Sequence, residues 1–337
     1  MDISNFTTIA ENIHCTLILK LDGNKIVAAG GGKAVKFTHQ GRERLLPISP
    51  AWKSPMLEQG KVQHVALAIW HAIHSTGENK KAGEDYLVMS AKKQIDGGAT
   101  FLDVNVDEYS NDNAVRVDVM KFVATFLSER FSVPLSIDSS NKAVLRAGLE
   151  CCRRNVGDPM LNSVSLERED CVELVPMFNT HVVVSAAGRT DLPTTLEGRL
   201  KNLREIIARL DAVGVKRERM HLDPLVFPIS TDPMNGKGFF DVTTAAKKEF
   251  GAVKITGGYS NISFGMPDRK LLNEVFIYLV VQAGAESGII NPVATPIKAV
   301  AALDPKSEPF QLAKAVLDGT DMYGMEYITA FREGRLG

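Results

Sequence analysis

Carboxylate and carboxamide side chains stand at the ends of several short apolar runs in this sequence. They are Asp103, Asn105, Asp138, Asn162, Asp223, Asn261 and Asn291. A carboxylate can accept two parallel hydrogen bonds from a planar pair of donors, and a carboxamide can both donate and accept. The set therefore fits a flat, nitrogen-rich heterocycle with a guanidine-like edge. It fits a bare phosphate badly, because no cluster of cationic side chains and no glycine-rich helix start accompanies it.

Each of these residues also has an ordinary structural interpretation. A single Asp or Asn is as readily explained by a helix cap or a turn. Five or six such residues at the ends of predicted strands are harder to explain in that way. We therefore interpret them together as one binding site.

The apolar runs predict the elements that position these side chains. From about residue 65, a short apolar run, a polar loop and a longer amphipathic stretch follow one another repeatedly. The runs cover residues 65–70, 100–106, 134–138, 160–165, 181–186, 220–227, 252–258 and 287–292. They lack strict alternation, which is typical of parallel strands buried on both faces. Eight strand–helix repeats predict a (β/α)8 TIM barrel, with an open doubly wound sheet as the alternative.

The remaining segments predict additions to this barrel. We expect an N-terminal extension over residues 1–61, which contains a β-hairpin of residues 15–21 and 25–29. The barrel is expected over residues 62–305. A helical tail is expected over residues 306–337, with its last helix ending near Gly324. The stretch AAGGGKAV (28–35) lacks the Ser or Thr that follows the Lys of a phosphate loop, so it predicts a turn.

Composition excludes several classes of protein. The 337 residues are 45% hydrophobic and 23% charged, as in a globular chain, and a net charge of −1 provides no field for nucleic acid or an anionic membrane. Four cysteines form no disulfide framework. With neither a secretory signal nor a spanning segment expected, we predict a cytoplasmic protein.

His64, His71 and His74 lack a Cys or carboxylate at ligand spacing, so we predict no metal site.

Five segments in order resemble the motifs of the pterin-binding methyltetrahydrofolate:corrinoid methyltransferases. They are LDVNV (102–106), SIDSSN (136–141), MLNSVS (160–165), HLDPLVFP (221–228) and GGYSNISFGMP (257–267). These barrel enzymes include the folate module of cobalamin-dependent methionine synthase and are related more distantly to dihydropteroate synthase. The resemblance covers residues ~84–292, and its most specific part is SNISFGMP followed by residues 271–292.

The resemblance implies a role for each polar residue. Asp138, Asn162 and Asp223 would hydrogen-bond the pterin ring, with Asp223 as the bidentate partner of its 2-amino edge. Asn261 falls where the family has a mobile Asn that reaches nitrogen 5, the atom that carries the transferred methyl group. The remaining members, Asp103, Asn105 and Asn291, would line the same floor. The substrates implied are tetrahydrofolate or methyltetrahydrofolate and a corrinoid (cobalamin), and homodimers are common in the family.

This chemistry needs such residues because a methyl group on a tertiary amine is a poor electrophile. Protonation of nitrogen 5, or a strong hydrogen bond to it as the bond breaks, removes that obstacle, and in-line geometry contributes much of the rest. The same residues serve both directions, so the physiological direction of transfer, biosynthetic methylation or catabolic demethylation, stays open.

Two departures from the family pattern leave alternatives open. Members commonly carry a Glu-Arg-Ile-Asn stretch at the end of the first strand, and the nearest segment here is IWHAIH (69–74); the loop VDEYSNDNA (106–114) is also unusually acidic. A dihydropteroate synthase would need a strand-seven Lys, and Lys254 lies there, but TGGYSN (256–261) follows in place of a Ser-Arg-Lys type motif. A folate-binding subunit without turnover is the other alternative.

The length of the chain leaves no room for a cobalamin domain beside the barrel. We find no Asp-x-His-x-x-Gly motif of the kind that ligates corrinoid cobalt. The corrinoid is therefore expected to arrive on a partner protein or free in solution.

Overall fold

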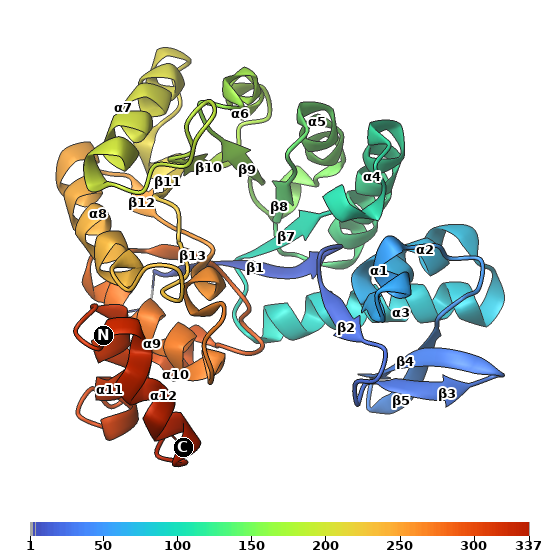
Figure 1. Cartoon of the computed structure of the whole chain (residues 1–337). Coiled ribbons are helices and arrows are strands. Elements are labelled where there is room, and N and C mark those ends of the chain that lie inside the picture. Colours follow the sequence, from blue (N-terminus) through green and yellow to red (C-terminus); the bar gives the residue numbers. More distant parts are fainter. Residues whose placement is uncertain (1–2, 4, 337) are drawn as a thin grey trace. The chain divides into compact units, whose positions relative to one another are not determined.

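Eight parallel strands form the central sheet of the computed structural model, which describes residue 3 and residues 5–336. Their order is β12-β11-β10-β9-β8-β7-β1-β13. A parallel bridge between Gly258 and Ile289 joins the segment after β12 to β13, the two ends of that order, and so closes the sheet. The predicted (β/α)8 barrel is thereby confirmed. The strands, labelled in Figure 1, are β1 (Thr7–His14), β7 (Phe101–Asn105), β8 (Leu135–Asp138), β9 (Met160–Val164), β10 (His181–Ser185), β11 (Met220–Asp223), β12 (Lys254–Ile255) and β13 (Ser287–Ile290).

Seven of the eight predicted strands are confirmed, and the first is wrong. The run VALAIW (65–70) lies in helix α2 (His64–His74), whose residues Val65 to Ile69 are all buried. A helix buried on every side shows no amphipathic period, so its sequence resembles that of a buried strand. The true first strand, β1, reads TTIAENIH, and its polar residues concealed it.

The barrel sheet consequently begins at Thr7, ahead of the predicted boundary at residue 62, and the residues after β1 form an insertion. A β-hairpin is present in this extension, but the predicted pairing of residues 15–21 with 25–29 is wrong. β3 (Ile26–Ala29) pairs with β4 (Gly32–His39), and β4 pairs with β5 (Arg42–Pro47), whereas β2 (Ile18–Lys20) pairs with β6 (Lys61–Gln63). Gly30 and Gly31, both at positive φ, form the turn predicted in this stretch.

Contacts divide the chain into two compact units. The N-terminal unit comprises residues 11–96 and 102–157, and the C-terminal unit comprises residues 1–10, 97–101 and 158–337. The helices of the N-terminal unit are α1 (Pro55–Glu58), α2, α3 (Gly77–Asp96), η1 (Asp107–Tyr109), α4 (Asn113–Arg130), α5 (Lys142–Cys151) and η2 (Arg154–Val156). Within this unit the sheet β3–β5 lies against α3 (Figure 1).

The C-terminal unit carries the rest of the barrel and the tail. Its helices are η3 (Glu169–Cys171), α6 (Leu174–Met177), α7 (Leu196–Ala212), η4 (Arg217–Arg219), α8 (Asn235–Phe250), η5 (Tyr259–Ser263), α9 (Arg269–Gln282), α10 (Ile297–Ala301), α11 (Glu308–Leu317), η6 (Met322–Gly324) and α12 (Met325–Arg332). Ile9, Phe101, Met160 and Val183 pack together as its buried core. The predicted helical tail is present, but it extends to Arg332 rather than ending near Gly324.

No helix in the described part of the chain has both the length and the apolar character needed to cross a bilayer.

The tail is held to the barrel by a backbone contact that only glycine allows. A Cβ atom added to Gly236, in the first turn of α8, would lie 2.1 Å from the carbonyl oxygen of Leu317 at the end of α11. We expect Gly236→Ala to lower the free energy of unfolding by about 1–3 kcal/mol, the usual cost of overpacking. The midpoint of urea unfolding measures this effect.

Gly238 in the same helix is the matched control. A Cβ atom added there meets nothing within 4 Å, so Gly238→Ala should be neutral or stabilise by up to about 1 kcal/mol. Equal midpoints for the two variants would contradict the contact.

Candidate functional site

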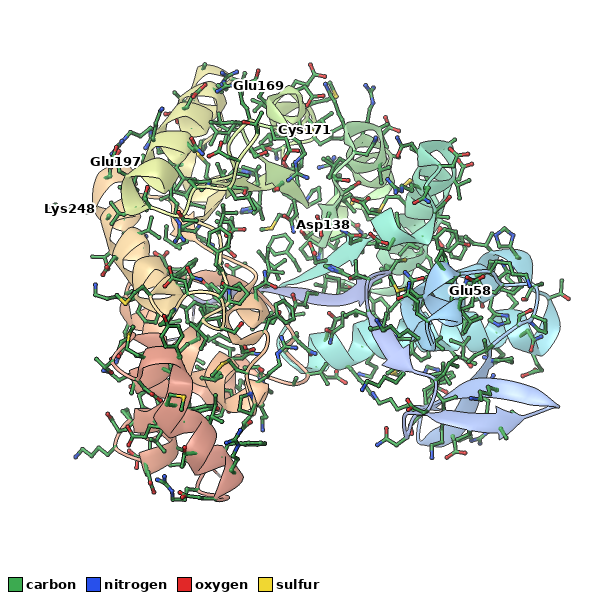
Figure 2. The ribbon with its side chains drawn as sticks, in the orientation of Figure 1. Glu58, Asp138, Glu169, Cys171, Glu197 and Lys248 are labelled. Carbon is green, nitrogen blue, oxygen red and sulfur yellow. The ribbon has the colours of Figure 1, made fainter. Side chains whose placement is uncertain are left out.

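The N-terminal unit brings three predicted side chains together at the ends of β7 and β8. Asn105 lies beside Asp138 in the parallel register. Its Nδ2 donates to Asp138 Oδ2 at 2.9 Å, and its Oδ1 accepts from the backbone N–H of Asp107 at 3.0 Å. Figure 2 labels Asp138, at the end of β8. Both polar atoms of the Asn105 carboxamide thus have partners, and the bond from Nδ2 orients the carboxylate of Asp138.

His14 joins this group, although the sequence did not suggest it. It is the last residue of β1, and its Nε2 lies 2.7 Å from Oδ2 of the fully buried Asp103. Burial disfavours the imidazolium, but the hydrogen bond and the charge of Asp103 outweigh it and raise the pKa of His14 to about 9. Burial, together with the charge of Asp103, raises the pKa of Asp138 to about 7.

The end of β1 also revises one departure from the family pattern. The stretch resembling Glu-Arg-Ile-Asn is Glu11-Asn12-Ile13-His14, not IWHAIH, which lies in α2. His14 therefore stands where that pattern has Asn. The sequence interpretation compared IWHAIH with the family pattern because it took the buried helix α2 for the first strand.

The same three residues are the described residues best placed to hold a metal ion. One donor atom each of His14, Asp103 and Asp138 lies within 4.8 Å of the others. In the structure, however, His14 and Asp103 bond to each other with the atoms that a metal would use. Two of the three histidines considered in the sequence have partners elsewhere: His64 Nδ1 lies 2.9 Å from the hydroxyl of Tyr86, and His71 Nε2 lies 2.7 Å from the carbonyl of Pro47.

In the C-terminal unit, Asp223 is the last residue of β11, and the charge of Arg199 acts on its carboxylate from a distance. Its Oδ1 accepts from the backbone N–H of Leu225 at 2.9 Å. Burial raises the pKa of Asp223 to about 6, although this hydrogen bond and the charge of Arg199 favour the carboxylate. Arg199, on α7, is only 2% exposed, and its Nε donates to the carbonyl of Pro193 at 3.3 Å. Among the described residues, no carboxylate lies within 4.0 Å of its guanidinium, so the electrostatic field of Asp223 is its compensation.

Sequence reasoning missed Arg199, but a signal was present. Arg199, Leu203, Ile206 and Leu210 recur at helical spacing on one stripe of α7, and all four are buried. A charged residue on an otherwise apolar stripe is unusual, because burial of an unpaired charge is costly. Such a residue predicts an electrostatic partner inside the fold.

Asn162 lies on β9 beside Val183 of β10 and is 7% exposed. The peptide bond that follows it, to Ser163, is cis. Arg168 reaches back to this strand, where its Nη2 donates to Ser163 Oγ at 2.7 Å. Arg168 and Arg199 are thus cationic side chains near the predicted residues, which the sequence interpretation did not include.

Asn261 differs from the other predicted residues. It lies in η5, after β12, where its backbone N–H donates to the carbonyl of Gly258 at 3.1 Å. A Cβ atom on Gly258 would lie only 3.1 Å from Asn261 Nδ2, so the glycine leaves room for the carboxamide. Among the described residues, the half-buried carboxamide of Asn261 has no hydrogen-bond partner. It is therefore available to a ligand.

Asn291 closes a turn, which is one of the structural roles that the sequence interpretation allowed for a single Asn. Its Oδ1 accepts from the backbone N–H groups of Val293 and Ala294 at 3.0 and 3.1 Å and closes the turn after β13. Asn141, beyond β8, likewise caps α5.

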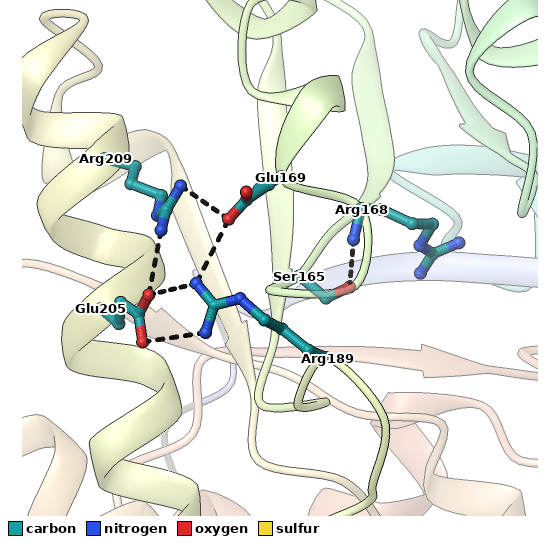
Figure 3. A network of polar contacts seen from close by, with 6 residues as sticks. All are labelled: Ser165, Arg168, Glu169, Arg189, Glu205 and Arg209. Atoms are coloured by element: carbon teal, nitrogen blue, oxygen red, sulfur yellow. Dashed lines mark hydrogen bonds and ion pairs between the residues drawn. The ribbon is translucent and has the colours of Figure 1, made fainter.

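A network of ion pairs fastens the loops that follow β9 and β10 to helix α7 (Figure 3). Arg189 Nη2 lies 2.5 Å from Glu205 Oε1, and Arg209 Nη1 lies 2.6 Å from Glu169 Oε2. Arg209 also contacts Glu205 at 2.9 Å, and Arg189 contacts Glu169 at 3.4 Å, which completes the network. Single exposed pairs contribute little, but a closed set of four residues restrains both loops together.

Comparison with known proteins identifies a family. The family model described as pterin binding enzyme matches residues 75–291. The chain is 26% identical over 260 residues to the methylcorrinoid:tetrahydrofolate methyltransferase of Eubacterium limosum, a match that covers 75% of this chain and 90% of the relative.

Solved structures show the same fold. The chain is similar to 7,8-dihydropteroate synthase from Vibrio fischeri ES114, with a TM-score of 0.54, 18% identity, and coverage of 68% of this chain and 86% of that one. It is also similar to a dihydropteroate synthase from Coxiella burnetii in complex with pteroic acid, with a TM-score of 0.52, 20% identity, and coverage of 73% and 88%. At such low identity, these similarities show the fold alone.

Proposed function

Since a family model matches more than half of the chain, this protein belongs to the pterin-binding enzymes, and we propose that it transfers a methyl group between nitrogen 5 of tetrahydrofolate and the cobalt of a corrinoid. The observation that supports this choice most is Asn261. It is the one predicted side chain without a hydrogen-bond partner among the described residues, and it lies in the motif where the family has the Asn that reaches nitrogen 5. The similarity to the Eubacterium limosum methyltransferase supports the same reaction.

The other residues would bind and orient the pterin. We propose that Asp138, Asn162 and Asp223 accept hydrogen bonds from its ring, with Asp223 on the 2-amino edge. Asp103 and Asn105 would act mainly through Asp138, which Asn105 already orients at 2.9 Å. Asn291 would shape the neighbouring turn, because its oxygen is held by Val293 and Ala294.

The chemical task of these groups is to make nitrogen 5 a better leaving group. A carboxamide that donates to nitrogen 5 as the carbon–nitrogen bond lengthens stabilises the charge that develops there, without any covalent intermediate on the protein. In the reverse direction, the same carboxamide orients the lone pair of nitrogen 5 for attack on the methyl group. The corrinoid supplies the cobalt that accepts or donates the methyl group, and we propose that it arrives on a partner protein or free in solution. A homodimer is also part of the proposal, by resemblance to the family.

The position of Lys254 disfavours a dihydropteroate synthase. Lys254 begins β12, and its Nζ donates at 3.1 Å to Oγ1 of Thr7 at the beginning of β1. Barrel enzymes place their chemistry at the carboxyl ends of the strands, and this contact lies at the amino ends. The residue is therefore badly placed to assist a pyrophosphate leaving group.

A spectroscopic assay tests the proposal. Cob(I)alamin mixed with 5-methyltetrahydrofolate and the protein should be converted to methylcobalamin, and methylcobalamin with tetrahydrofolate should give the reverse reaction. Folate binding without a spectral change in either direction would favour a non-catalytic binding subunit. Condensation of a pterin pyrophosphate with 4-aminobenzoate would instead identify a synthase.

A further inference from the structure

The turn between the tail helices α11 and α12, which are labelled in Figure 1, exposes a run of large apolar side chains. Met322, Tyr323 and Met325 are 52%, 67% and 67% exposed. Met234, the residue before α8, is also exposed and lies beside this turn, because a Cβ atom on Gly319 would lie 2.7 Å from its sulfur. We call Met234, Met322, Tyr323 and Met325 the tail patch. They offer roughly 500 Å² of surface, an area at which patches on monomers are often binding sites.

Tyr323 is held in the tail patch at a conformational cost. Its φ of 61° and ψ of 14° are left-handed, a conformation that Gly adopts freely and that few other residues adopt. The turn is also fixed from behind: a Cβ atom on Gly324 would lie 2.8 Å from Met266 Cε, and Tyr327 Oη donates to the carbonyl of Asp268 at 3.2 Å. The chain thus keeps an aromatic side chain facing outward on a firmly packed turn. Tyr and Met are both enriched in the cores of protein interfaces.

The charges around the tail patch are compensated within the chain. Asp318 Oδ2 lies 2.7 Å from Lys314 Nζ, and Asp321 Oδ1 accepts from the backbone N–H of Glu326 at 3.1 Å. The exposed side chains of Glu326 and Arg332 on α12 add one charge of each sign. An apolar centre with a rim of both signs does not select a strongly acidic or basic partner. It is compatible with its own copy, since neither the centre nor the rim repels an identical surface.

We propose that the tail patch is the interface between two copies of this chain, related by a two-fold axis. Paired in this way, two patches bury about 1,000 Å² in total, the area that a specific interface needs. The proposal rests on the proposed function only for the expectation of a homodimer, which came from resemblance, and it assigns that homodimer a surface. Most of this surface belongs to the tail, which lies beyond the residues 75–291 that the family model matches.

Sedimentation equilibrium of wild type and Tyr323→Asp tests the proposal. At micromolar concentration, wild type should have about twice the chain mass of 36.8 kDa. Tyr323→Asp should raise the dissociation constant of the dimer at least about a hundredfold, because each copy loses an aromatic contact and buries a charge. Asp tolerates the left-handed conformation, so the turn itself should keep its shape. An unchanged far-UV circular dichroism spectrum checks that the variant is folded.

Met177→Asp is the matched control. Met177, at the end of α6, is 54% exposed, as much as Met322, but it lies outside the tail patch. This variant should stay dimeric. A monomeric wild type would overturn the proposal and leave the tail patch for another protein, such as a corrinoid carrier. A dimer that Tyr323→Asp leaves intact, or that Met177→Asp dissociates, would place the interface elsewhere.

Cross-linking tests the same surface in a chain that keeps Tyr323. Under mild oxidation by copper phenanthroline, Met325→Cys should give a disulfide-linked dimer on a non-reducing gel, and Met177→Cys should give none. Equal yields from the two variants would overturn the proposal, even if Tyr323→Asp fails to fold. Neither measurement needs folate or corrinoid, so failure of the proposed methyl transfer would leave this interface standing, and loss of the interface would leave the methyl transfer to its own assay.

Discussion

Replacing Asp223 by Asn is expected to lower the affinity for tetrahydrofolates by at least about a hundredfold, because two charge-assisted hydrogen bonds contribute about 1.5–3 kcal/mol each. The Asn side chain would also turn an amide N–H toward a pterin edge that itself donates. In the structure, this carboxylate uses one oxygen for the backbone N–H of Leu225 and receives the field of the buried Arg199. The substitution therefore removes the charge that the surrounding residues are arranged to maintain.

The pH dependence provides a second signature of the same residue. Because the pKa of Asp223 is about 6, wild-type affinity should decline as the pH falls through this value, since the protonated acid no longer accepts both bonds. The Asp223→Asn variant should lack this contribution and keep only that of Asp138, the other carboxylate proposed for the pterin, whose pKa is about 7. Isothermal titration with 5-methyltetrahydrofolate across this range measures both effects.

A control for Asp223→Asn lies in the same loop. Asp232 is exposed, and its Oδ1 accepts from the backbone N–H of Met234 at 2.8 Å, a role that an Asn can also fill. Asp232→Asn should bind folate like wild type. Unchanged affinity in Asp223→Asn would remove Asp223 from the pterin site.

The carboxylates singled out from the sequence share a property that makes them visible. Asp103, Asp138 and Asp223 each lie within or end a short, continuous apolar run, and such runs form buried parallel strands. A polar residue at the end of such a strand is visible without knowledge of its neighbours. The ends of strands in a barrel also share one face, so the sequence alone predicts that these residues line one site.

The residues that were missed depend on pairings distant in the sequence. His14 was hidden because β1 is rich in polar residues, and it acts on Asp103, which is 89 positions later. Arg199 is part of a helix that looks amphipathic as a whole, and only its place on the buried stripe distinguishes it. No local pattern records that a carboxylate in one segment needs a cation from another.

These two cations suggest a common principle in the two units. Each unit has a half-buried carboxylate proposed for the pterin, and each supplies a cation that acts on it: His14 on Asp138, and Arg199 on Asp223. Among the described residues, the cation of neither pair lies within ion-pair distance of the carboxylate, and each carboxylate gives one oxygen to a protein N–H, Asp138 to Asn105 and Asp223 to Leu225. A direct salt bridge would hold the charge but occupy the acceptors that a ligand needs.

Replacing Asn261 by Ala should slow methyl transfer by about 10²–10³-fold, the usual effect of removing one donor from a developing charge. Binding of 5-methyltetrahydrofolate should change little, because the carboxamide, which has no hydrogen-bond partner among the described residues, serves nitrogen 5 mainly as the bond breaks. The two variants should therefore differ: Asp223→Asn should lower the affinity for folate, and Asn261→Ala should lower the rate of methyl transfer.

Single-turnover conversion of cob(I)alamin, with folate saturating, measures this rate separately from binding and product release. Asn24→Ala, an exposed Asn in the insertion after β1, is the control and should transfer the methyl group at the wild-type rate. The same factor should appear in the reverse reaction, because both directions pass through one transition state. If Asn261→Ala transferred the methyl group at the wild-type rate with unchanged folate affinity, its carboxamide would have no part in the chemistry, and stabilisation of nitrogen 5 would have to come from another donor.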